Sequence, residues 1–202
     1  MYLILLVIQA VSIVFLFIES GYVFVKMNTG IHKYLFLSCI ATLVNNTGYF
    51  LIMLSTSEEQ YLTGVQMSYL GRVWIPFSLF AFVMAVCKIR IKKPLMIGLS
   101  FFHAFIFFLV LTCRRHKLYY SSMEYVEKGD WSDLVCGDGI FHKIYSVTIL
   151  AYIVIGLFCL FRATYREKIR TSKRRMLFVT MAIVSESAGF LIYLTGVTGM
   201  YD

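Results

Sequence analysis

The chain has 202 residues, of which 59% are hydrophobic and 17% aromatic, and it carries a formal net charge of +8. A soluble domain of this length does not hold so large an apolar share, so the composition excludes a soluble domain and indicates a membrane protein. In such a chain a basic excess is typical of loops that stay in the cytoplasm, and we expect no nucleic-acid partner.

Six apolar runs follow one another along the chain, and each is close to the roughly 20 residues that a membrane-spanning helix needs. The first run has no basic segment before it and is too long for a signal peptide, so it predicts a true span. The whole chain, residues 1–202, is therefore predicted to be one all-α, polytopic transmembrane helix bundle in contact with the lipid bilayer. The predicted spans are residues 2–25, 31–54, 61–87, 94–113, 144–161 and 176–197.

Basic residues are distributed unevenly between the two sides of this bundle. If the N-terminus is outside, the three inner segments hold two, four and seven of the 19 lysines and arginines. Cytoplasmic loops are enriched in these residues, so we predict a multi-pass protein of the inner (cytoplasmic) membrane with its N-terminus outside. The stretches "CKIRIKK" and "YREKIRTSKRR" then face the cytoplasm.

The predicted outer loop, residues 114–143, is the only segment between spans that is longer than a short connector. It contains Gly-Asp-Trp and Cys-Gly-Asp-Gly turns together with Tyr119, Tyr120 and Trp131. These features favour a lid or a hairpin, and a connector with interfacial aromatic residues is the alternative. As a lid, the loop would fold over the mouth of the bundle, and its aromatic side chains would shield a cavity there.

Cysteine and histidine positions do not indicate a cofactor. The five cysteines form no CxxC pair and no Cys/His pair at the spacing of metal ligands, so we expect neither a metal site nor a disulfide scaffold. A bridge between Cys113 and Cys136, which share the outer side, stays open. His103 has no second histidine at its depth, which argues against a bis-histidine haem site. Because signatures of P-loop, kinase and hydrolase sites are also missing, we expect no catalytic residue in this chain.

Several polar residues, whose transfer into lipid is energetically unfavourable, lie inside the predicted spans. At about 1.5 Å per residue, Asn46, Arg72, His103 and Glu186 all lie near the bilayer midplane, on four different helices. A charged side chain at that depth costs at least about 2.5 to 3.5 kcal/mol, so it should face the protein interior and find a partner. We predict that these residues, together with Asn45, converge on one internal site reached from the outside.

Two interpretations of this polar set stay open. In the structural one, Arg72 and Glu186 form a static ion pair, and the asparagines only make hydrogen bonds between helices. In the functional one, Arg72 and the flanking carboxamides bind a small anionic ligand, and Glu186 is the internal partner that the ligand displaces. Tyr69 lies on the same helix face as Arg72 and belongs to the candidate ligand site.

Three stretches of the chain resemble one known family. "NNTGYFLIMLS" and "MSYLGRVWIPFSLFAFVMAVC" are similar to the paired second and third helices of the N-terminal seven-transmembrane sensor region of bacterial histidine kinases, a region also fused to diguanylate cyclases. "SAGFLIYLTGVTGMYD" resembles the sixth helix of that region and its outer turn. The most specific part is Tyr69-Leu70-Gly71-Arg72 followed by Pro76.

This resemblance implies a membrane sensory-input module for signal transduction in a two-component system. Its input would be a small molecule or a membrane state. The family has seven spans and then an effector domain, so a chain with six spans is expected to be truncated and not itself an enzyme. The resemblance also implies a homodimer that forms through the effector region.

The alternative class is a small transporter or permease subunit, in which Arg72 and Glu186 would handle a substrate or a proton at the midplane. Inverted repeats would favour transport, but the first three and last three predicted spans share no repeated motif.

Overall fold

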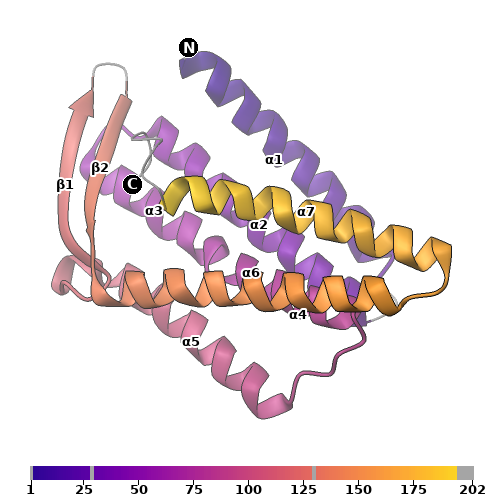
Figure 1. The fold of residues 1–202 in the computed structure, drawn as a ribbon. Coiled ribbons are helices and arrows are strands. Elements are labelled where there is room, and N and C mark those ends of the chain that lie inside the picture. Colours follow the sequence, from indigo (N-terminus) through magenta and orange to yellow (C-terminus); the bar gives the residue numbers. More distant parts are fainter. Residues whose placement is uncertain (1, 28–29, 129–130, 195–202) are drawn as a thin grey trace.

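Residues 2–27, 30–128 and 131–194 are described by the computed structural model, which is a bundle of long helices with a β-hairpin at one end (Figure 1). The helices are α1 (Tyr2–Val25), α2 (Gly30–Leu54), α3 (Glu58–Arg72), α4 (Trp74–Val86), α5 (Lys93–Leu111), α6 (Ile140–Arg166) and α7 (Arg170–Leu194). Between α5 and α6 lie a short 3-10 helix, η1 (Cys113–Arg115), and the strands β1 (Tyr120–Lys128) and β2 (Trp131–Asp138). The prediction of a transmembrane helix bundle is confirmed.

Five stretches of the described residues are long and apolar enough to cross a membrane, namely α1, α2, Glu58–Val86, α5 and α6. The helix α6 extends beyond the predicted span 144–161 at both ends. The predicted sixth span, 176–197, lies in α7 as far as Leu194, and residues 195–197 lie outside the described part of the chain. Only 6% of the most apolar 18-residue stretch of α1 is buried inside the protein, so this helix faces lipid over most of its surface.

The predicted third span, 61–87, is divided into α3 and α4 at Val73. The physical reason is Pro76, which has no backbone N–H and cannot bond the carbonyl of Arg72 four residues earlier. Val73 keeps helical backbone angles (φ −66°, ψ −27°), so the two helices still form one continuous membrane-spanning stretch. The break therefore frees a carbonyl group without ending the span.

Glycines make the seam between α2 and α3 unusually close. A Cβ atom added at Gly48 would overlap Ser68, and one added at Gly71 would overlap the backbone of Ala41 and Asn45. One added at Gly64 would lie 2.7 Å from the Ile52 side chain. Small residues at such positions let transmembrane helices pack backbone against backbone. The α2–α3 seam is therefore a dense, fixed part of the bundle.

The predicted outer loop 114–143 folds into an antiparallel hairpin, with Val126 opposite Asp133 and Lys128 opposite Trp131. Figure 1 shows the hairpin at the end of the bundle where α6 begins, here called the hairpin end. Its residues Tyr120 and Leu134 belong to a buried core that also contains residues of α3, α5 and α6. No disulfide joins Cys113 with Cys136.

Candidate functional site

A cavity of about 250 Å³, partly open to the surface, lies between α3, α4 and α6, with α2 and α7 along its sides. The half nearer the hairpin is lined mainly by polar side chains, those of Asn45, Tyr69, Arg72, Tyr119, His142, Tyr145 and Ser146. The other half is lined mainly by apolar residues, including Leu79, Phe80, Val83, Ile153, Gly156 and Ile183. The cavity therefore has a polar end and an apolar end.

Tyr69 is the centre of the polar end. The guanidinium carbon of Arg72 lies 5.1 Å from the centre of the Tyr69 ring, and Nη1 of Arg72 donates to the Tyr69 hydroxyl at 3.5 Å. The hydroxyls of Tyr119 and Tyr120, from the hairpin region, lie 3.3 and 3.1 Å from the same oxygen. Tyr69 thus connects the membrane-embedded arginine with the structure that covers it.

The cluster of Tyr69, Tyr119 and Tyr120 has one more O–H proton than its internal hydrogen bonds need. A hydroxyl has one proton and two acceptor positions, and an arginine can only donate. Tyr69 meets all three neighbours if it accepts from Arg72 and from one hairpin-region tyrosine and donates its own proton to the other. Burial raises the pKa values of Tyr119 and Tyr120 well above the usual range, so both phenols keep their protons. One of these protons is then available to another acceptor.

Tyr145 of α6 holds the break between α3 and α4. Its hydroxyl donates to the Arg72 carbonyl at 3.2 Å, the group that Pro76 leaves without its helical partner. Tyr145 also lines the cavity. A change at the cavity wall is therefore connected directly to the backbone at the helix break.

His103 lies behind the cavity wall rather than in it. Its side chain is completely buried, and its Nε2 lies 3.1 Å from the hydroxyl of Tyr152, which does line the cavity. The imidazole ring is also 5.4 Å from the ring of Phe77 and 5.9 Å from that of Tyr145. His103 therefore contacts the α6 tyrosines from behind and does not line this cavity, and its part in a ligand site stays a prediction.

The two adjacent asparagines face different neighbours. Asn45 lines the cavity, and among the described residues its buried Oδ1 has no hydrogen-bond partner. Asn46 points towards α1, where its Oδ1 accepts from Nε2 of Gln9 at 2.8 Å and its Nδ2 donates to the Thr42 carbonyl at 2.9 Å. Successive helical residues point about 100° apart, so Asn46 faces α1 while Asn45 faces the cavity, and a role of Asn46 in ligand binding stays a prediction.

The side chain of Glu186 lies outside the described residues, so its pairing with Arg72 stays a prediction. Three other residues of α7, namely Ile183, Ser187 and Phe190, line the cavity. Their spacing of four and three residues places them on one face of the helix. Ser187 is buried, and its hydroxyl donates to the Ile183 carbonyl at 2.6 Å.

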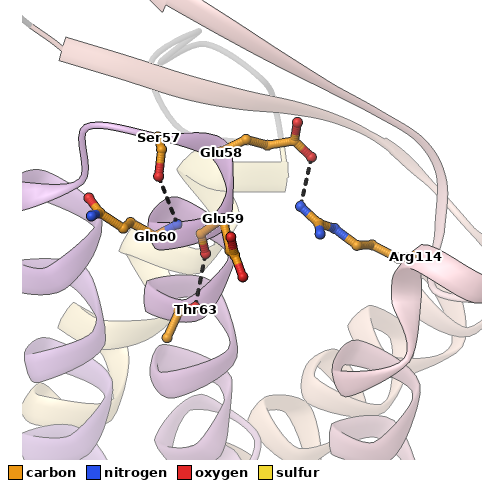
Figure 2. Close-up of polar contacts among 6 residues, drawn as sticks. All are labelled: Ser57, Glu58, Glu59, Gln60, Thr63 and Arg114. Atoms are coloured by element: carbon orange, nitrogen blue, oxygen red, sulfur yellow. Dashed lines mark hydrogen bonds and ion pairs between the residues drawn. The ribbon is translucent and has the colours of Figure 1, made fainter.

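Besides the bonds of Tyr119 and Tyr120 to Tyr69, further contacts attach the two strands to the bundle, and one ion pair joins η1 to α3. The hydroxyl of Tyr61 donates to the buried Asp133 at 3.3 Å, and Nδ1 of His142 lies 2.7 Å from the Asp138 carboxylate. Figure 2 shows the ion pair, in which Arg114 of η1 reaches Glu58 in the first turn of α3 at 2.9 Å. The side chain of Trp131, predicted to be part of a lid, lies outside the described residues.

The sequence reasoning missed most of the α6 contribution. A helical stripe of polar and aromatic residues is visible in the sequence at His142, Tyr145, Ser146 and Tyr152, but tyrosines near a membrane surface are usually interfacial anchors. It also missed Gln9, the partner of Asn46. Within the described residues, no group of three or more His, Cys, Asp or Glu side chains is placed to hold a metal ion.

A family model described as the N-terminal 7TM region of histidine kinase matches residues 5–202. No curated protein matches the chain. No solved structure matches it either.

Proposed function

Because the chain belongs to the family of N-terminal seven-transmembrane regions of histidine kinases, and is therefore a multi-pass membrane sensory module, we propose that it detects a small ligand with an anionic group in the cavity beside Arg72. The signal passes to an effector domain of the histidine kinase or diguanylate cyclase type. The N-terminus lies outside the inner membrane, and the full-length protein is a homodimer through its effector region.

The observation that carries this proposal is the position of Arg72 in the cavity wall. A guanidinium binds carboxylates with paired, charge-assisted hydrogen bonds, which are strong where water is scarce. The neighbouring groups suit the same ligand, because the tyrosine cluster has a spare phenol proton and Asn45 has an amide that can donate. An arginine within a membrane span is costly, and such residues commonly mark a functional site.

Ligand binding reaches two movable parts of the molecule. The anionic group accepts hydrogen bonds from Arg72 and from the tyrosine cluster. In that cluster, the bonds of Tyr119 and Tyr120 to Tyr69 hold the hairpin against the bundle. Tyr145, at the same cavity wall, holds the carbonyl at the helix break. A ligand that prefers one arrangement of these contacts shifts the population of the whole module towards it. The hairpin acts as a lid, and α4 and α6 carry the signal against the fixed α2–α3 seam.

The test uses the full-length protein in membrane vesicles and measures effector output with a panel of monocarboxylates from acetate to decanoate. We expect at least one acid to change the output of the native protein, and Arg72→Ala to abolish that change while the protein stays folded in the membrane. Arg114→Ala is the matched control, because Arg114 makes only a half-exposed ion pair at the hairpin end. A response that survives in Arg72→Ala would overturn the proposal.

A further inference from the structure

The cavity follows one face of α6 for a considerable length. Its lining residues on this helix run from His142 through Tyr145, Ile149 and Tyr152 to Gly156, at the spacing of three and four residues that marks one helical face. At about 1.5 Å per residue, this stretch of helix is roughly 21 Å long. The cavity, of about 250 Å³, is therefore elongated along α6.

The apolar end contains a glycine that packing does not require. A Cβ atom added at Gly156 would lie 3.7 Å from Cγ1 of Val83, which is an ordinary van der Waals contact. At Gly48 and Gly71 an added Cβ would instead overlap the neighbouring helix. Gly156 is therefore not there to bring two helices together, and its missing side chain leaves space at the far end of the cavity.

We propose that the ligand is an amphiphile, with a carboxylate at Arg72 and an unbranched apolar tail that lies along α6 towards Gly156. This inference rests on the proposed function, because it takes the anionic head group from there and adds the tail. A linear tail matches the elongated shape, and the apolar side chains of Leu79, Phe80 and Val83 match its chemistry. The polar and apolar ends of the cavity correspond to the two ends of such a molecule.

A free carboxylic acid and a bilayer phospholipid share this chemistry of an anionic head and a linear chain. The structure favours the free acid, because Tyr119 lines the polar end and is held there by its bond to Tyr69. A glycerol backbone with a second acyl chain would have to displace Tyr119. A free acid needs only the guanidinium and the spare phenol proton.

The experiment measures binding of acetate, hexanoate, decanoate and decan-1-ol to the full-length protein in phosphatidylcholine nanodiscs by equilibrium dialysis, with empty nanodiscs subtracted. Four proteins are compared, namely the native chain, Arg72→Ala, Gly156→Leu and the control Gly98→Leu. Gly98 is on α5, where an added Cβ has no atom within 4 Å. Lipid extraction and mass spectrometry of the native protein identify any phospholipid that it retains.

We expect affinity to rise by up to about fourfold for each methylene between hexanoate and decanoate, which corresponds to about 0.8 kcal/mol per buried CH₂. Gly156→Leu should weaken the binding of decanoate by at least about tenfold and leave the binding of hexanoate unchanged, because the leucine fills the far end of the cavity. Gly98→Leu should leave the binding of both acids unchanged. Decan-1-ol should bind far more weakly than decanoate, since it lacks the charge that Arg72 recognises.

The other outcomes separate the two proposals. If acetate and decanoate bind equally, Gly156→Leu changes nothing and Arg72→Ala abolishes binding, the apolar tail is wrong and the proposed function stands. If Arg72→Ala binds every acid as the native protein does, the proposed function itself fails. Equal binding of decan-1-ol and decanoate would overturn the proposal that the cavity recognises a carboxylate. A retained phospholipid that decanoate displaces would assign the apolar end to the bilayer lipid and overturn the free acid.

Discussion

The α2–α3 seam and the space between α4 and α6 both contain glycines, but those in the seam allow close packing, whereas Gly156 leaves open space. At Gly48 and Gly71 the missing side chain lets two helix backbones meet, and an added Cβ would overlap the neighbouring chain. At Gly156 the missing side chain leaves room beside the cavity. The comparison teaches that one half of the bundle is a fixed support, while the other half keeps an internal space that something else can fill.

The largest expected effect comes from an extra methyl group in the fixed half. Gly71→Ala should lower the free energy of unfolding by about 3 kcal/mol, because overpacking of a tight seam forces backbone shifts. Gly156→Ala should be neutral or should stabilise by up to about 1 kcal/mol, since alanine is the better helix former. Thermal unfolding of both variants in nanodiscs measures the difference. Equal loss of stability in the two variants would remove the distinction between the two halves.

The second prediction concerns the helix break that borders the cavity. Tyr145→Phe removes the donor that serves the Arg72 carbonyl, so it should cost about 1 to 3 kcal/mol of stability and reduce the ligand response. Tyr165→Phe is the control, because Tyr165 is 82% exposed near the other end of the same helix. Unfolding and effector output are measured on both variants. A Tyr145→Phe protein that matches the native one would show that the carbonyl has an equivalent second partner.

The third prediction separates the two adjacent asparagines. Asn46→Leu should cost about 0.6 kcal/mol, the average for a hydrogen bond between transmembrane helices, and should leave the ligand response intact. Asn45→Leu should reduce the response, because Asn45 lines the cavity. A double-mutant cycle of Asn46→Leu with Gln9→Leu gives the coupling energy between the two side chains. A response lost with Asn46 and kept without Asn45 would reverse this assignment.

The smallest effect is expected at the start of α7, far from the hairpin. The carboxylate of Glu167 accepts hydrogen bonds from the Ile169 amide and the Ser172 hydroxyl, and these contacts lower its pKa below the usual value. The stabilisation is therefore present at neutral pH and lost as the pH falls through the lowered pKa.

The protection factor of the first-turn amides of α7, which is the exchange rate corrected for its intrinsic dependence on pH, should accordingly fall at acidic pH in the native protein. In Glu167→Gln the same turn should show no such step, because the glutamine amide does not titrate. A step that persists in Glu167→Gln would assign the titration to another group.

The sequence predicted the bundle well because spans are a matter of length and composition, which hydropathy measures directly. It also predicted that Asn45, Tyr69 and Arg72 belong together, since depth and helical face can be counted from the nearest loop. It did not separate Asn45 from Asn46, because the rotation of α2 depends on the glycines that bring it against α3. The hairpin and the α6 tyrosines were harder still, since tertiary contacts rather than local pattern decide which tyrosines turn inward.

The most direct test of the central claim is the distance between a bound carboxylate and Arg72. Acetate and decanoate labelled with ¹³C at the carboxyl group are bound to full-length protein whose arginines carry ¹⁵N, and solid-state NMR in bilayers measures the dipolar coupling between them. The account predicts a carboxyl carbon within about 4 Å of a guanidinium nitrogen and loss of that coupling in Arg72→Lys. A bound acid without coupling to any arginine, or with coupling that survives in Arg72→Lys, would contradict it.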